Sequence, residues 1–484
     1  MRRFMKARLI PALAISAAVL LVFNPAISPA LAKEEPPVGG QPKPFKVLEV
    51  VDAKLSNGIP VTFVPFGRVP KTTIRVVVRV GNLNEGAATW LADLTVDLMR
   101  EGAAGKSGPE LSRAASSMGG ALGTSTGLDE TSFSINVLQE FGPAAVGLLA
   151  DVILRPDFPA AEFARIRADY QRNLAVSLAQ PQPQAQAAFM RLLYGDHPYG
   201  RVFPANRQLE GYVMADLVAF HEQNFGARRS RIYVAGRFDQ AAILEAPEAA
   251  FGAWKAGPEV LFDPPRPRSG KRVVLIDRPG AEQSTIRLGI PVINLTHPDY
   301  VALQVANTLL GGYFSSRITA NIREDKGYTY SPRSSLSSRY RDTFWAQLAD
   351  VTTKDTGAAL SEIFFEIDRL QSPELATASE LEAVKNYYAG SFILRNATAR
   401  GVMGQLVGID RQGVGRDYLA SFIERVFATT PEDLQRLARQ QLRDQDMALV
   451  VVGDLAVIRR QLEALEQLKG IEFVLEEPPG VTGD

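Results

Sequence analysis

The spacing of hydrophobic residues divides this chain into helix-like and strand-like segments. Apolar side chains recur at helical spacing over 89–100, 142–154, 163–178, 299–310, 356–370 and 381–393. Apolar and polar residues alternate, as they do in a half-buried strand, over 131–138 and 341–348. Long helices interspersed with strands predict an α+β fold in which helices cover each sheet.

Two landmarks in this pattern occur twice. The strand-like run TIRVVVRVG begins at Thr73, and TIRLGIPV begins at Thr285, 212 residues later. A β-branched run stops at Gly236 and another at Gly453, 217 residues later, and each is followed by a helix-like stretch. Two separate landmarks with nearly equal offsets predict an internal duplication.

A proline-rich segment at 262–270 separates the two copies. Its prolines cannot donate the hydrogen bonds of a helix or sheet, so we interpret it as an interdomain linker. The predicted domains are therefore 46–261 and 271–475. The segments 33–45 and 476–484, rich in Pro, Gly and charge, are predicted to be a flexible leader and tail.

The N-terminus has the pattern of an export signal. Residues 1–8 are rich in Arg and Lys, 9–23 are almost wholly apolar, and Ala30-Leu31-Ala32 fits a cleavage site. The alternative, a retained anchor, is disfavoured because a spanning helix needs about 20 apolar residues. We therefore predict a signal peptide at 1–32 and a soluble mature chain located in the periplasm, with no membrane segment.

Composition narrows the possible chemistry. The 484 residues include no Cys, which excludes disulfides, thiolate metal sites and a lipid-modified N-terminal Cys. With 53 basic against 53 acidic residues, nothing favours nucleic-acid binding. The three histidines, His197, His221 and His297, do not have the spacing of metal ligands.

Four segments carry a recognisable pattern, at 80–107, 118–137, 194–201 and 309–331, and the last, with LLGGYFSSRITANIREDKGYTYS, is the most specific. Together they resemble the insulinase–pitrilysin family of zinc metallopeptidases, the inverted zincins with the signature H-x-x-E-H. The resemblance implies two related domains, each a mostly antiparallel sheet covered by helices.

The zinc motif of that family is degenerate here. By resemblance it falls on Asp93-Leu94-Thr95-Val96-Asp97, so that Asp93 and Asp97 replace both histidines. Val96 replaces the glutamate and cannot accept a proton from a zinc-bound water. The third ligand, a glutamate, is expected at 169–174, but no Glu occurs in 163–209. We predict that this chain binds no zinc or other cofactor and is inactive alone.

Asp93 and Asp97 could in principle hold another metal. They lie one turn apart on a helix, and oxygen ligands suit calcium or magnesium. Such ions usually need more ligands than two carboxylates, so we prefer a polar helix face without metal.

A second pair of family residues is retained. By resemblance, Arg323 and Tyr330, seven residues apart, reach the scissile bond of the substrate. A guanidinium can donate to backbone carbonyls, and a phenol can donate to a developing oxyanion. The alternative is that Arg323 forms a surface ion pair with Glu324 or Asp325 and Tyr330 is a core aromatic.

The segment after the degenerate helix is a candidate peptide-binding strand. Gly119, Gly120, Gly123 and Gly127 would leave its edge open to an extended peptide. Because glycine also weakens strands, the alternative is a loop. The predicted substrate contacts are Gly123, Thr124, Ser125 and Thr126.

Three functions remain open. By resemblance, the chain fits the non-catalytic subunit of a heterodimeric zinc metalloendopeptidase, which lends Arg323 and Tyr330 to the site of a homologous, zinc-bearing partner. The second is an inactive pseudo-peptidase that binds unfolded peptides as a homodimer. The third, an inactive core subunit of a respiratory complex, is disfavoured by the signal peptide and by the lack of a membrane segment.

Overall fold

The computed structural model describes residues 49–268 and 270–477. The predicted signal peptide at 1–32 and leader at 33–45 lie outside the described residues, as do residues 478–484 of the predicted tail. Within the described ranges, no helix is both long and apolar enough to cross a membrane.

The first of two large sheets is built from residues before the proline-rich segment. Its strands lie in the order β1-β2-β8-β3-β7-β6. Neighbouring strands are antiparallel except for β2 and β8, which are parallel. The strands are β1 (Val51–Lys54), β2 (Pro60–Pro65), β3 (Lys71–Val78), β6 (Leu122–Thr126), β7 (Thr131–Leu138) and β8 (Ser230–Gly236).

The second sheet follows the same plan. Its order is β11-β12-β10-β13-β9-β14, and β9 is parallel to both of its neighbours, β13 and β14, while the other pairs are antiparallel. The strands are β9 (Arg272–Asp277), β10 (Gln283–Val292), β11 (Arg333–Arg339), β12 (Asp342–Thr352), β13 (Ala448–Gly453) and β14 (Phe473–Glu476).

The pairing register confirms the predicted duplication. Thr73 pairs with Ala235, and Thr285 pairs with Val452. These are equivalent pairs, since they have the offsets of 212 and 217 residues found in the sequence. Five strands have the same order in both sheets, and the predicted α+β fold with two related domains is confirmed.

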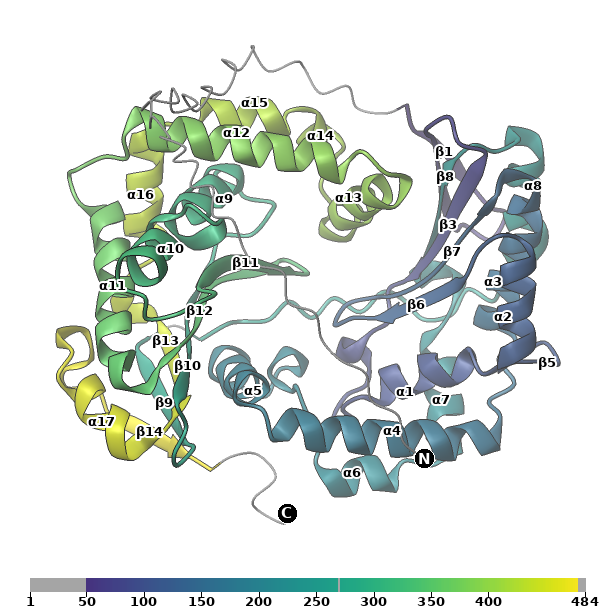
Figure 1. The fold of residues 1–484 in the computed structure, drawn as a ribbon. Helices are drawn as coiled ribbons and strands as arrows, with labels where there is room; N and C mark the ends of the chain where they lie inside the picture. The colour runs from purple at the N-terminus through teal and green to yellow at the C-terminus, as the bar shows by residue number, and fades with distance from the viewer. Residues whose placement is uncertain (1–48, 269, 478–484) are drawn as a thin grey trace, which may run out of the picture. The chain divides into compact units, whose positions relative to one another are not determined.

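Helices cover one face of the first sheet. Figure 1 shows α3 and α8 lying against it. Buried Ile74 and Phe133 of the sheet belong to one apolar core with Val146 and Leu149 of α3. The helices of this half are α1 (Leu91–Met99), α2 (Gly108–Ser117), α3 (Gly142–Leu154), α4 (Ala160–Leu178), α5 (Pro181–Tyr194), α6 (Asn206–Gly211), α7 (Met214–Asn224) and α8 (Gln240–Phe251).

The second half is richer in helices. The helix expected over 299–310 ends at 307 and continues as a π-helical turn, Thr308–Gly312; a second π-helical turn spans Ala320–Asp325. The helices are α9 (Tyr300–Asn307), α10 (Arg317–Thr319), α11 (Thr356–Gln371), α12 (Ala378–Arg395), α13 (Ala399–Gln412), α14 (Asp417–Ala420), α15 (Phe422–Ala428), α16 (Pro431–Gln441) and α17 (Leu455–Glu463).

In each half, one helix also contacts the sheet of the other half. Helix α5 precedes the proline-rich segment, yet its Ala188, Phe189 and Leu193 pack on Val450 and Val452 of the second sheet. In return, Asp410 of α13 accepts a hydrogen bond from Tyr233 of β8 at 2.7 Å and forms an ion pair with Arg231 at 3.0 Å. The predicted linker therefore separates the two sheets but not all of the helices that pack on them.

Candidate functional site

The segment between β3 and α1 is held by a close backbone contact. A Cβ at Gly81 would lie 2.1 Å from the carbonyl oxygen of Gly127, so only glycine fits there. The next residue, Asn82, donates its backbone N–H to that carbonyl at 3.1 Å. This contact places the Asn82 side chain beside the helix that carries the degenerate motif.

Glu85 caps the start of α1. Its carboxylate accepts the backbone N–H of Trp90 at 3.0 Å and that of Ala92 at 3.0 Å. A carboxylate at a helix N-terminus is favoured by the helix dipole. Burial nevertheless dominates and raises the pKa of Glu85 to about 7.

Asp93, at the position predicted for the first histidine of the zinc motif, lies next to this cap. Its Oδ2 accepts a hydrogen bond from Asn82 Nδ2 at 2.7 Å. Burial raises the pKa of Asp93 to about 6, and the nearby Asp97 carboxylate adds to the shift. The buried Glu85 and the partly buried Asp93 therefore form an acidic pair joined through the Asn82 amide.

Asp97, at the position predicted for the second histidine, accepts a hydrogen bond from a tyrosine. Tyr170 of α4 donates its hydroxyl to Asp97 Oδ2 at 2.7 Å. Tyr170 lies in the 169–174 window in which the third ligand was expected, and its ring packs edge-on against Trp90 at 5.7 Å. Sequence reasoning missed Tyr170 because it searched that window only for glutamate.

These side chains do not fit a zinc site. Val96 is buried and apolar, the Tyr170 hydroxyl occupies a lone pair of Asp97, and no imidazole or thiolate is present. Among the described residues, no three His, Cys, Asp or Glu side chains are grouped to hold a metal ion. A pocket of about 200 Å³ remains here, lined by Glu85, Asp93 and, from the second sheet, Arg339.

The buried Asp93 gives a prediction on stability. Because the pKa of Asp93 is raised from 3.8 to about 6 on folding, stability is lost as the pH rises from about 4 to about 6. Asp93→Asn removes that charge and keeps the shape, so we expect stabilisation on the order of 2 kcal/mol at pH 8. The gain should vanish at pH 4, as measured by denaturant unfolding at both values.

The same variant also tests the degenerate site for function. If the site has no catalytic role, Asp93→Asn should leave the peptidase activity of a reconstituted complex within about twofold of wild type. A less stable variant at pH 8, or a large loss of activity in a folded complex, would show that the Asp93 carboxylate has a role of its own.

Arg323 and Tyr330 meet in the second half. The Arg323 guanidinium carbon lies 4.5 Å from the ring centre of Phe314 and 4.8 Å from that of Tyr330. Arg323 also forms an ion pair with Glu324 at 3.1 Å. Tyr330 is 79% exposed and Phe314 63% exposed, so Tyr330 is not a core aromatic.

Hydrogen bonds of neighbouring residues hold the segment that contains Arg323 and Tyr330 in place. Arg317 donates from Nε and Nη2 to the two oxygens of Glu380 at 2.9 and 3.1 Å. These hydrogen bonds lower the pKa of Glu380 to about 2. Thr329 Oγ1 donates to the carbonyl of Asp350 at 2.7 Å, which ties the residue before Tyr330 to β12.

The predicted peptide-binding segment forms β6, the edge strand of the first sheet. Residues 123–126 are strand rather than loop, and Thr124 accepts a hydrogen bond from Arg100 at 3.3 Å. The backbone before β6 requires glycine at two positions, whether or not a peptide binds there. Gly119 has a φ of 78°, and a Cβ at Gly120 would lie 2.2 Å from the carbonyl oxygen of Asn136.

All three histidines make local structural contacts. His197 Nδ1 accepts the N–H of Tyr199 at 3.2 Å, and His297 Nδ1 accepts that of Asp299 at 3.1 Å. His221 Nε2 lies 2.8 Å from the carbonyl of Ile153, and burial lowers its pKa.

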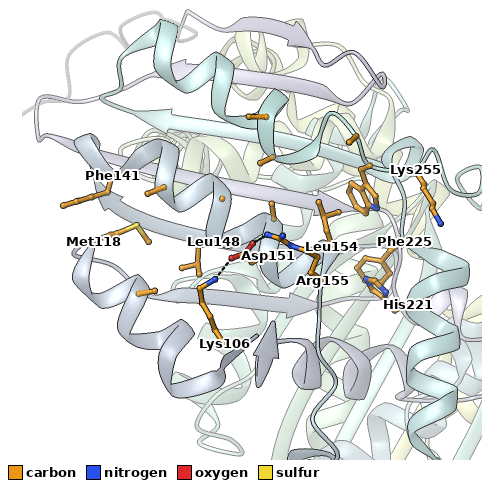
Figure 2. Close-up of a pocket in the computed structure, with 18 of the residues that line it drawn as sticks. Lys106, Met118, Phe141, Leu148, Asp151, Leu154, Arg155, His221, Phe225 and Lys255 are labelled. Carbon is orange, nitrogen blue, oxygen red and sulfur yellow. Dashed lines mark hydrogen bonds and ion pairs between the residues drawn. The ribbon is translucent and has the colours of Figure 1, made fainter. Parts of the chain in front are cut away.

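A large pocket lies elsewhere, between α2, α3, α7 and α8, with a volume of about 1310 Å³. Figure 2 shows Asp151 in it between Lys106 and Arg155, and both basic residues form ion pairs with it. His221 lines this pocket too, but its ring is held by the Ile153 carbonyl. These contacts leave the pocket without a nucleophile and base pair that could act together.

The fold and the two candidate sites define a peptidase-like chain. Family models match in two consecutive stretches: insulinase (peptidase family M16) over residues 68–203, and the peptidase M16 inactive domain over 213–388. The chain therefore belongs to the insulinase family of peptidases, peptidase family M16.

Individual relatives agree with this assignment. An uncharacterized zinc protease of Mycobacterium bovis is 29% identical over 277 residues, which is 55% of this chain and 62% of that protein. An uncharacterized zinc protease of Mycobacterium leprae is 24% identical over 404 residues, 82% of this chain and 90% of the relative. The chain thus spans less than two thirds of the first relative and most of the second.

A solved structure shows the same fold. The peptidase M16 inactive domain from Pseudomonas fluorescens superposes with a TM-score of 0.77 at 24% identity, over 84% of this chain and 98% of that one.

Proposed function

We propose that this chain is the non-catalytic subunit of a two-chain zinc metalloendopeptidase, and that it lends Arg323 and Tyr330 to the active site of a homologous zinc-bearing partner. The observation that carries this proposal is the contact of the half-buried Arg323 with two exposed aromatic rings, those of Phe314 and Tyr330. An arginine and a phenol held at the surface can serve a reaction that takes place on another chain.

The chemistry follows from these two side chains. The Arg323 guanidinium donates to backbone carbonyls of the peptide and places the scissile bond. The Tyr330 hydroxyl donates to the oxygen that gains negative charge on the peptide carbonyl as water adds. The zinc of the partner would supply the activated water, a role that needs a base where this chain has Val96.

Other features fit this role. The edge strand β6, with Gly123, Thr124, Ser125 and Thr126, can pair with an extended peptide through its free backbone groups. The predicted signal peptide supports a periplasmic location for the complex. The similarity to the M16 inactive domain supports association with an active subunit.

The decisive experiment is purification of the chain from its native source. A similar-sized protein with an intact H-x-x-E-H motif should copurify, and the mixture should hydrolyse peptides in a chelator-sensitive way. A stable homodimer that binds unfolded peptides, with no such partner, would instead favour the pseudo-peptidase alternative.

Arg323 gives a prediction of its own. Arg323→Lys keeps the charge but loses the planar fork that contacts both Phe314 and Tyr330. We expect it to lower kcat and raise KM, each by roughly tenfold, because the peptide is placed less well. Steady-state kinetics on the reconstituted complex measure both constants.

A matched control is Arg460→Lys on α17, an exposed arginine of the same half. Normal kinetics for both variants, in complexes that assemble fully, would mean that Arg323 does not contact substrate.

A further inference from the structure

Two arginines form a row across the second sheet. Arg333 of β11 and Arg287 of β10 both pair with Leu348 of β12, on opposite sides of that strand. Side chains of directly paired residues point to the same face of a sheet. The guanidinium of Arg287 lies 5.1 Å from the ring centre of Phe189, so this is the face on which α5 packs.

The row has no counter-charge. In the described part of the chain, the charged groups that act on Arg287 are two further arginines and no carboxylate. The Nε of Arg287 is buried without a hydrogen-bond partner. Burial, together with the like charges of Arg339 and Arg333, lowers the pKa of Arg287 to about 10. Like charges grouped in this way cost stability, and an unpaired group of this kind is typical of a binding site.

The row is close to the Arg323–Tyr330 pair along the chain. Arg333 follows Tyr330 by three residues, and Thr329 bridges to Val351 of β12, so the segment runs beside the sheet edge. Three residues of extended chain span about 10 Å. Arg333 is exposed on the edge strand β11, and its long side chain can cover much of that distance.

We infer that Arg333 and Arg287 select peptides with an acidic side chain two or three residues from the bond to be cut. This inference rests on the proposed function, because it assumes that the peptide lies at Tyr330. A carboxylate on the peptide would supply the counter-charge that the row lacks, through charge-assisted hydrogen bonds to the guanidinium groups. Arg323 would still bind the peptide backbone, whatever its side chains.

The test uses pairs of peptides that differ only by Asp or Asn at these positions. The wild-type complex should cleave the Asp peptide with a kcat/KM about tenfold higher than that of the Asn peptide. A ratio of this size is expected from one exposed charge-assisted hydrogen bond. Arg333→Gln should remove most of this preference, and Arg333→Glu should reverse it. Arg460→Gln on α17 makes the same charge change away from the row and should leave the preference intact.

Two readouts separate this inference from the proposed function. A complex that cleaves Asp and Asn peptides equally well would overturn the inference alone. If no peptide is cleaved, the proposed function fails, and binding of fluorescent Asp and Asn peptides to the isolated chain becomes the readout. Tighter binding of the Asp peptide, lost in Arg333→Gln, supports the arginine row even then, whereas equal affinities overturn it.

Discussion

Tyr330→Phe is expected to lower the kcat of the reconstituted complex by about 10²–10³, or ~3–4 kcal/mol of transition-state stabilisation. The substitution removes one hydroxyl and keeps the ring that stacks on Arg323. Tyr330 is largely exposed, so the loss of its hydroxyl should not disturb the core of the second half. The ground-state peptide gains less from this hydrogen bond than the oxyanion does, so KM should change much less than kcat.

Steady-state kinetics after a check of assembly would measure this effect. A matched control is Tyr387→Phe on α12, which removes a hydroxyl from another exposed tyrosine and should leave kcat near normal. Near-normal kcat for Tyr330→Phe itself would leave the Arg323–Tyr330 pair without a catalytic role.

The purified chain alone is expected to bind no stoichiometric zinc and to cleave no peptide. The family motif needs two histidine ligands and a glutamate base, and the side chains of Asp93, Val96 and Asp97 cannot replace them. The carboxylate of Asp97 already accepts a hydrogen bond from the Tyr170 hydroxyl. Adding the zinc-bearing partner should change activity from undetectable to readily measurable, and a chelator should abolish it.

Metal analysis and peptide cleavage on the separate chains and on the mixture would check this result. The control is the partner alone, which should bind zinc yet cleave poorly without Arg323 and Tyr330. One zinc per chain in the isolated protein, together with chelator-sensitive cleavage, would contradict both the site description and the proposed role.

Local pattern predicted the elements well because it depends on near neighbours. The strand expected over 131–138 is β7, with the same bounds, and the helix expected over 142–154 is α3. The helix expected over 299–310 was too long, because the chain passes into a π-helical turn at 308 that periodicity alone does not reveal.

Long-range packing was harder to predict. Helix α5 was assigned to the first domain by chain continuity, but its apolar face packs on the second sheet. Tyr170 and Asp97 are 73 residues apart, and the hydrogen bond between them depends on how α4 packs on α1. Neither contact leaves a periodic or compositional signal.

The sequence by itself determined the α+β class and the duplication, and it predicts the loss of zinc chemistry at positions 93–97. These follow from spacing and from which side chains can accept a proton or bind a metal. The tertiary structure decided that Arg323 stacks between Phe314 and an exposed Tyr330, and that Arg287 and Arg333 share one face without a counter-charge. These arrangements depend on strand register and on the packing of distant segments, which a single sequence does not specify.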